Sequence, residues 1–132
     1  MKPDFSGEYV LNRQACVLSA SAAAFQSAVM RIAHREPTFR CSAAFEADGK
    51  TFEFSFERAI DGLDVPAGEN EVSRFSWDGD AIVSEFRTGG TEPIFTMIWR
   101  YELMEGGRRL RATERMRGAG RDQDNVWEFE RK

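Results

Sequence analysis

Three charged residues lie on strand faces that are otherwise apolar, and these are the positions where the sequence could do chemistry. Arg58, Glu114 and Arg131 each continue or interrupt a row of alternating apolar side chains. Burying a charge is costly unless it is paired or reaches water. Each is therefore expected at the mouth of an enclosed interior, or Arg58 pairs with Glu114. The alternative is that Arg58 or Arg131 orients the anionic or polar head of a bound molecule.

No set of residues amounts to a catalytic signature. The chain has no Ser-His-Asp order, no Gly-rich phosphate loop and no metal-ligand set. His34 is the single histidine, and Cys16 and Cys41 are spaced neither for a metal site nor for a redox pair. We therefore expect two free thiols in a reducing compartment, and neither a metal nor a cofactor.

An enzymatic alternative remains open. A carboxyl group buried among apolar side chains has a raised pKa and can act as an acid or a base. An isomerase or cyclase that uses Glu114, Tyr9 or Tyr101 inside the protein would need only such groups.

Length and charge exclude several classes of protein. The chain has 132 residues, which is the size of one domain, taken as residues 1–132, and its net charge is -4. An acidic balance argues against a general partner among nucleic acids or anionic membranes. No apolar run is long enough to span a bilayer, and no apolar signal segment follows Met1, so the cytoplasm is the expected location.

A basic stripe near the C-terminus has an ordinary explanation. Its members alternate along one strand: Arg109, Arg111, Arg115 and Arg117. Acidic residues of neighbouring strands should share the same outer face, namely Glu102, Glu128 and Glu130. Cross-strand ion pairs explain the stripe, and no nucleic-acid partner is expected.

The segment Thr51–Arg58 sets the architecture. Phe52, Phe54 and Phe56 alternate with polar residues, which is typical of an antiparallel strand with one buried face. Most of the chain repeats this pattern between short turns, at Asp48-Gly49, Asp61-Gly62, Asp78-Gly79, Gly89-Gly90 and Gly106-Gly107. The segment Leu63–Asn70 is expected to be a rim loop, and Pro93–Met104 the longest strand. The sequence predicts an all-β up-and-down meander of about 8–10 strands that closes into a barrel.

One segment breaks this pattern. Residues 13–28 are rich in Ala, with Ser19 or Ser21 as a candidate N-cap. We expect one short helix there, which packs on the barrel through Phe25.

The opening of the chain resembles a known family. Phe5-Ser6-Gly7-Glu8-Tyr9 is similar to the Phe-x-Gly-x-Trp opening of lipocalins and fatty-acid-binding proteins, the calycin group. Asp4–Asn12 together with Trp77–Asp80 most resembles small bacterial lipocalin-like proteins of unassigned function. The resemblance implies a lipocalin-like barrel with a helical lid after the first strand, and a carrier or sensor role. Trp127-Glu128-Phe129 stands in place of the Arg-x-Tyr pair that holds a carboxylate in many fatty-acid-binding proteins, so a specific fatty-acid site does not carry over.

The interior decides the function. A small barrel is either filled by its own side chains or holds one small ligand. A small hydrophobic or amphipathic ligand is the expected partner, and a solid-core barrel that only binds other proteins is the alternative. The candidate lining residues are Tyr9, Phe45, Phe52, Phe54, Phe56, Arg58, Phe95, Trp99, Tyr101, Glu114, Trp127 and Arg131.

Two isoleucines lie on the face opposite the core. Ile94 and Ile98 are expected either to lie under the Ala-rich helix or to form a subunit contact. The second reading predicts a homodimer.

Overall fold

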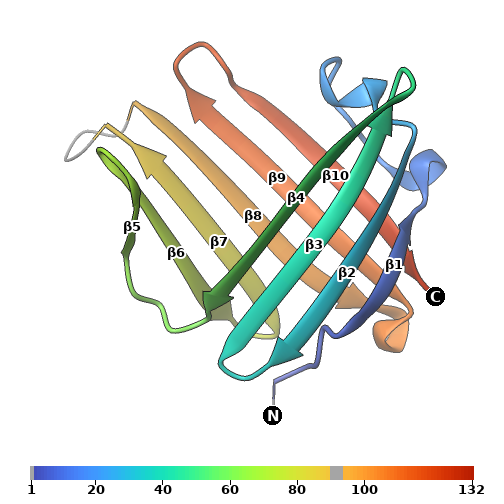
Figure 1. The fold of residues 1–132 in the computed structure, drawn as a ribbon, viewed down its shortest axis with the longest axis horizontal. Coiled ribbons are helices and arrows are strands. Elements are labelled where there is room, and N and C mark those ends of the chain that lie inside the picture. Colours follow the sequence, from blue (N-terminus) through green and yellow to red (C-terminus); the bar gives the residue numbers. More distant parts are fainter. Residues whose placement is uncertain (1, 90–93) are drawn as a thin grey trace.

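The computed structural model describes residues 2–89 and 94–132, which form ten antiparallel strands in one sheet (Figure 1). The strands are Gly7–Leu11 (β1), Ser27–Arg35 (β2), Thr38–Ala47 (β3), Lys50–Ala59 (β4), Val65–Gly68 (β5), Glu71–Asp78 (β6), Ala81–Thr88 (β7), Phe95–Met104 (β8), Arg109–Gly118 (β9) and Gln123–Arg131 (β10). Three short 3-10 helices accompany them: Arg13–Ala15 (η1), Ala22–Ala24 (η2) and Glu105–Gly107 (η3). The predicted all-β meander is confirmed. Gly90 and Pro93 lie outside the described residues.

The sheet curls so that its two halves face each other. β1 pairs with both β2 and β10, and this pairing joins β1–β4 to β5–β10. Figure 1 shows the strands of β1–β4 crossing over those of β6–β10 at a steep angle. β4 and β5 are the two end strands, and no backbone ladder joins them in the part of the chain that the structure describes. The barrel therefore has a gap beside β4.

Strand alternation places the apolar faces inside, as the sequence predicts. Along β2 every second residue is buried, from Ala28 to His34, and β3 buries Phe39, Cys41, Ala43 and Phe45 in the same way. On β4, however, Phe52 is 50% and Phe54 is 44% exposed. The reason is that β4 has a paired strand on one side only, so its inward face opens toward the gap.

The expected helix after the first strand is replaced by two single turns, η1 and η2. Between them Val17 forms an isolated antiparallel bridge with Val126, with both backbone hydrogen bonds made, at 2.9 and 2.8 Å. After η2 the chain is already extended at Phe25, and the Gln26 N–H donates to the Glu46 backbone oxygen at 2.9 Å, so the stretch that follows Ser19 and Ser21 forms a single turn before β2 begins. Likewise, the expected rim loop contains β5, which pairs with β6 through an irregular register at Pro66.

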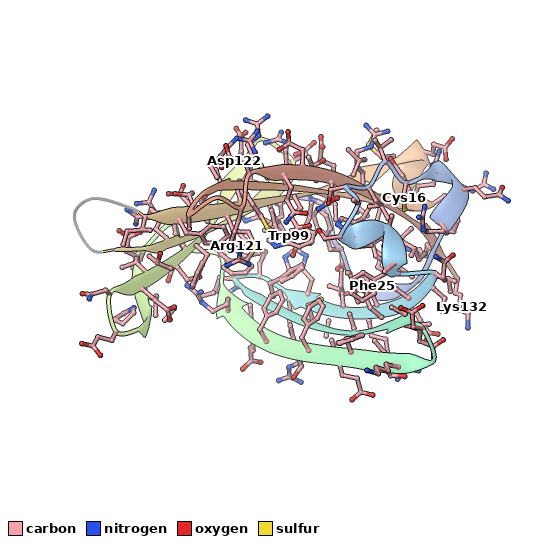
Figure 2. All side chains as sticks on the ribbon, turned by 90° about the horizontal axis from the view of Figure 1, so that it is seen from above. Cys16, Phe25, Trp99, Arg121, Asp122 and Lys132 are labelled. Carbon is pink, nitrogen blue, oxygen red and sulfur yellow. The ribbon has the colours of Figure 1, made fainter. Side chains whose placement is uncertain are left out.

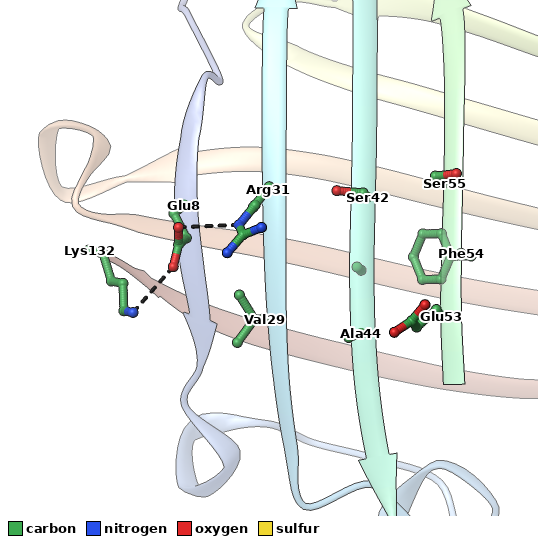
Figure 3. Close-up of a pocket in the computed structure, with 10 residues that line it drawn as sticks. Glu8, Val29, Arg31, Ser42, Ala44, Glu53, Phe54, Ser55 and Lys132 are labelled. Atoms are coloured by element: carbon green, nitrogen blue, oxygen red, sulfur yellow. Dashed lines mark hydrogen bonds and ion pairs between the residues drawn. The ribbon is translucent and has the colours of Figure 1, made fainter. Parts of the chain in front are cut away.

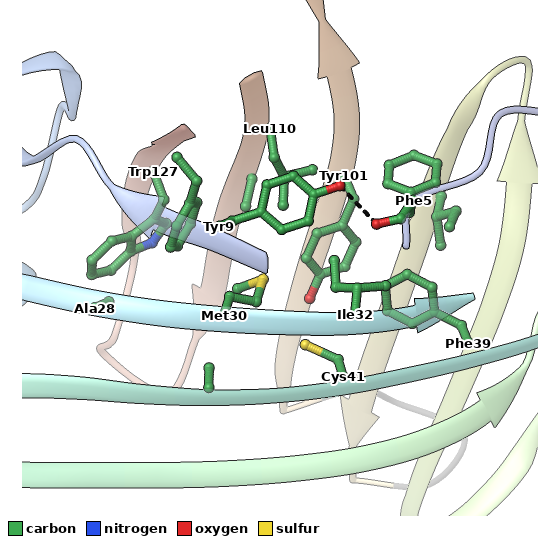
Figure 4. Packing of buried hydrophobic residues seen from close by; sticks show 14 of the residues in the cluster. Phe5, Tyr9, Ala28, Met30, Ile32, Phe39, Cys41, Tyr101, Leu110 and Trp127 are labelled. Carbon is green, nitrogen blue, oxygen red and sulfur yellow. Dashed lines mark hydrogen bonds between the residues drawn. The ribbon is translucent and has the colours of Figure 1, made fainter. Parts of the chain in front are cut away.

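The N-terminal motif closes one end of the barrel, where Phe5 contacts His34, Phe39 and Trp77. Figure 4 shows Phe5 and Tyr9 within the buried packing. Phe5 and Tyr9 are fully buried, and the Tyr9 hydroxyl donates to the backbone oxygen of Phe5 at 2.7 Å. The lone histidine belongs to this packing. His34 Nδ1 accepts from the backbone N–H of Phe5 at 3.1 Å, and its Nε2 lies 2.8 Å from Glu36 Oε1. His34 thus ties the start of the chain to the end of β2.

Both cysteines are free thiols, as expected. Cys41 lies in the core, and burial raises the pKa of its thiol to about 12. Cys16 is partly exposed beside β10, and burial also raises its pKa. No group of ligating side chains that could hold a metal ion occurs among the described residues.

The predicted cross-strand ion pairs of the basic stripe are confirmed for Arg109 and Arg111, whereas Arg115 and Arg117 pair with an acidic residue that was not among the predicted partners, and Glu102 pairs with Arg100. Glu128 lies between Arg109, at 3.4 Å, and Arg111, at 2.6 Å. Arg115 and Arg117 both pair with Asp124. Among the described residues, no helix is both long and apolar enough to cross a membrane.

Candidate functional site

A cavity of about 430 Å³ lies between the two halves of the sheet. Figure 2 shows side chains from both halves, Trp99 among them, pointing into the space between them, with Phe25 of the η2 segment beside it. The walls of the cavity are mostly aromatic and apolar. They comprise Met30, Phe45, Phe54, Phe56, Arg58, Ser73, Phe75, Ser84, Phe86, Met97, Trp99, Tyr101, Ala112, Glu114, Trp127 and Phe129. The interior between the two halves is therefore not completely filled by side chains.

A second cavity of about 370 Å³ adjoins the first on the side of η2. The two share five lining residues: Phe45, Phe54, Trp99, Glu114 and Trp127. We call the outer part of the second cavity the mouth, and define it by Ser21, Phe25, Phe52 and Gln123. Phe25 packs edge-on against Phe45 and Phe52, with both ring centroids 5.6 Å away. The η2 segment thus partly covers the way into the interior.

The structure gathers most of the predicted site residues around these cavities. Eight of the twelve line the inner one, and Phe52 lines the second. The other three lie elsewhere. Tyr9 and Arg131 are bonded to each other at the closed end, with Arg131 Nη2 2.7 Å from the Tyr9 hydroxyl. Phe95 is buried at the start of β8 with the guanidinium of Arg121 over its ring at 4.5 Å.

Arg58 and Glu114 do not pair with each other, contrary to one prediction from the sequence. Arg58 donates to the hydroxyl of Ser73, and at 3.2 Å to the backbone oxygen of Ser73. Its guanidinium also lies over the ring of Phe75 at 4.9 Å. Arg58 therefore links β4 to β6 across the gap and forms part of the cavity wall there.

Glu114 is the buried carboxyl group of the cavity, with 6% of its surface exposed. Its Oε1 accepts from Asn125 Nδ2 at 2.9 Å and from Trp127 Nε1 at 3.3 Å. Burial raises the pKa of Glu114, and the two hydrogen bonds oppose that rise. Burial also raises the pKa of the neighbouring Tyr101 well above its usual range.

Several residues of the site are not among those predicted. Ser73 and Ser84 supply polar groups to the wall, and Asn125 supports Glu114. Phe25 was expected to pack on the barrel, but not over its mouth. The signal for Ser73 and Ser84 was present, because both share a strand face with aromatic neighbours, Phe75 and Phe86.

Replacing Glu114 by glutamine is expected to change the pH dependence of stability. Because burial raises the pKa of Glu114 above its ordinary 4.5, the folded protein binds this proton more tightly than the unfolded chain does. The stabilisation that this proton gives the folded protein is complete below the pKa that Glu114 has in the unfolded chain. It is lost as the pH rises through the higher pKa that Glu114 has in the folded protein. Thermal melts of both proteins from about pH 4 to neutral should therefore show the Tm of the wild type falling relative to the Tm of Glu114→Gln as the pH rises. Parallel curves would contradict the raised pKa.

A larger hollow, of about 830 Å³, lies on the outer face of β1–β4 (Figure 3). Three of its charged residues pair with one another: Glu8 bonds Arg31 at 3.3 Å and Lys132 at 3.2 Å. Its floor carries small side chains such as Ser42 and Ala44. Only one layer of the sheet bounds it, whereas both halves enclose the interior cavity. A ligand site is normally enclosed and largely apolar, so the interior is the candidate site.

Several solved structures have a fold similar to that of this chain. No protein-family model and no curated protein sequence matches the chain. Among solved structures, a mutant of the fluorescent protein UnaG is similar, with a TM-score of 0.68 and 13% identity over 97% of this chain and 96% of that one. A secretory abundant heat soluble protein from Ramazzottius varieornatus has a TM-score of 0.67 and 9% identity, over 99% and 98%. A Schistosoma mansoni fatty acid binding protein in complex with arachidonic acid has a TM-score of 0.57 and 13% identity, over 97% and 96%.

At these identities the likeness shows the fold alone. The chain has the calycin-type, lipocalin-like β-barrel fold that the Phe5–Tyr9 motif implied.

Proposed function

We propose that this protein binds a small apolar or amphipathic molecule in its interior, as a carrier or sensor. The observation that carries the proposal is the cavity of about 430 Å³ between the two halves of the sheet. Its volume lies within the range of small-molecule sites, and its walls are apolar with a few polar groups, as such sites usually are. A similar fold that holds arachidonic acid, in the fatty acid binding protein, supports the same use of the interior.

In this proposal the aromatic walls supply affinity and two charged residues define the polar positions. Trp99, Trp127 and the phenylalanines of β3 and β4 would enclose the apolar body of the ligand. Arg58 and Glu114 would contact its polar parts. Phe25 and Phe52 would be displaced when the ligand enters through the mouth.

Filling the cavity tests the proposal. Ser84 lines the interior on β7, whereas Ser42 lies exposed on the outer face of β3. We expect Ser84→Phe to weaken binding of the fluorescent apolar probe N-phenylnaphthylamine by roughly tenfold or more, because the new ring occupies space that the probe needs. The matched control, Ser42→Phe, should bind the probe like the wild type. Equal affinities of all three proteins, each shown to be folded by circular dichroism, would refute an interior site.

An isomerase or cyclase remains the second candidate, and one observation favours it. Glu114 is a carboxyl group of raised pKa in a cavity large enough for a substrate, which is the arrangement a general acid or base needs. Mass spectrometry of a bound ligand before and after incubation separates the two functions, because a carrier returns its ligand unchanged.

The proposal also includes a cytoplasmic location and a homodimer. Free thiols support a reducing, cytoplasmic location. Ile94, which is 64% exposed, supports a homodimer contact on the outer face of the sheet. A relationship to small bacterial lipocalin-like proteins is supported by the motifs at the start and middle of the chain.

A further inference from the structure

The hydrogen bonds of Asn125 determine how Glu114 is presented to the cavity. The backbone N–H of Ser19 donates to Asn125 Oδ1 at 2.7 Å. A backbone N–H can only donate, so this contact identifies Oδ1 as the acceptor and leaves Nδ2 as the donor. Asn125 Nδ2 then donates to Glu114 Oε1 at 2.9 Å. Asn125 itself is 1% exposed, so water does not compete for these bonds.

Trp127 reinforces the same arrangement. Its indole N–H, which can only donate, also reaches Glu114 Oε1, at 3.3 Å. One carboxyl oxygen is therefore occupied by two fixed donors from β10. The other oxygen, Oε2, has no hydrogen-bond partner among the described residues. Glu114 lines both cavities, so this free oxygen is available where the two cavities meet.

The charged residues around Glu114 Oε2 favour a hydrogen-bond donor of the ligand over a carboxylate. Of the described residues that line the two cavities, Arg58 is the sole cation, and it is engaged by Ser73 and Phe75 on the side of the gap. A ligand carboxylate beside Glu114 would bring two carboxyl groups together in a low-dielectric setting, whereas a donor would bond an oxygen that has no partner among the described residues.

We propose that Glu114 Oε2 receives the hydrogen-bond donor of an amphipathic ligand, a hydroxyl or an amine, and that this end of the cavity rejects a carboxylate. The inference rests on the proposed function, because it assigns the polar end of the ligand that the cavity holds. It specifies the ligand class as apolar alcohols or amines.

Three probes that differ only in their head group test it: dodecanol, dodecylamine and dodecanoic acid. Their affinities are measured by calorimetry at neutral pH, below the concentrations at which they aggregate. We expect the wild type to bind the alcohol, the amine or both roughly tenfold more tightly than the acid, since a hydrogen bond to a buried charged group is worth about that much. The affinities of dodecanol and dodecylamine show whether the site binds a hydroxyl or an amine.

Two variants locate the effect. Glu114→Gln keeps the shape of the side chain and an oxygen for Asn125 and Trp127, and we expect it to abolish the preference for donors over the acid. The matched control is Glu57→Gln, which makes the same change at an exposed carboxylate of β4 that pairs with Arg40 and lines neither cavity, and it should leave that preference in place. An acid that binds the wild type as tightly as both donors, or a preference that survives in Glu114→Gln, overturns the inference. If Glu114→Gln does not fold, the order of the three probe affinities for the wild type still tests the inference. If none of the probes binds the wild type, the proposed function itself fails.

Discussion

Replacing Asn125 by alanine is expected to lower the free energy of unfolding by about 3 kcal/mol. The substitution leaves the Ser19 backbone N–H without its acceptor and removes one of the two donors to Glu114 Oε1, so that Trp127 alone remains there. Each buried polar group left without a partner costs about 1–3 kcal/mol. The measurement is equilibrium unfolding in urea, with the slope of the transition checked against the wild type.

Asn12 provides the matched control for this prediction. Its side chain makes one exposed hydrogen bond, to Glu130 at 3.2 Å. Asn12→Ala should therefore change stability by less than about 0.5 kcal/mol. Hydrogen exchange adds a local test: in Asn125→Ala the amide of Ser19 should lose protection, because its acceptor is gone. An Asn125→Ala protein as stable as Asn12→Ala, with the Ser19 amide still protected, would show that water replaces the asparagine at little cost.

Asn125 also shows what the sequence could not reveal. It lies in a run of turn-forming residues, Asp122–Asn125, and by composition that run belongs to a turn. In the structure β10 already begins at Gln123, and Asn125 pairs directly with Glu114 on β9. The long pairing with β9 overrides the local turn preference. A polar residue that is buried only because its partner lies across a strand pair cannot be recognised without the register.

The faces of the strands were predictable, whereas depth along the barrel was not. Alternation has a period of two, so one register places every inward residue correctly, and Tyr9, Phe45 and Trp127 are all buried as expected. Their distance from the closed end depends on how the strands stagger, which is a tertiary property. For this reason Tyr9 packs at the closed end against Phe5 and Arg131, while Trp127 lines the cavity.

The helix prediction was wrong for a related reason. An Ala-rich stretch after a strand favours a helix by propensity, but propensity is a weak preference that tertiary pairing outweighs. Here Val17 pairs with Val126, and Asn12 N–H donates to Glu128 at 2.8 Å. β10 thus determines the path of the first part of the segment, and pairing with β3 from Gln26 onward, where the Gln26 N–H donates to Glu46 at 2.9 Å, leaves room for a single turn after Ser21.

Replacing Gly7 by alanine is expected to lower the free energy of unfolding by about 3 kcal/mol. Gly7 has a φ of 153°, which side-chain-bearing residues rarely adopt, and a Cβ there would lie 3.1 Å from Arg131 Nε and 3.6 Å from the ring of Tyr9. Arg131 cannot easily retreat, because its Nη2 is bonded to the Ser6 backbone oxygen at 3.0 Å and to the Tyr9 hydroxyl at 2.7 Å. The glycine of the N-terminal motif is therefore required by the packing that closes the barrel. Urea unfolding measures the loss.

Gly49→Ala separates the two causes of that loss. Gly49, in the turn between β3 and β4, has a φ of 74°, and a Cβ there would meet nothing within 4 Å. It therefore reports backbone strain alone, of about 1 kcal/mol. If the close approach to Arg131 matters, Gly7→Ala costs more than Gly49→Ala, and the cost of Gly7→Ala shrinks when Arg131→Ala is already present. Equal costs at both glycines, with additive effects in the double variant, would mean that Arg131 moves aside freely. The closed end of the barrel would then depend on Phe5 and Tyr9 without Arg131, and the motif would need its glycine only for the backbone conformation.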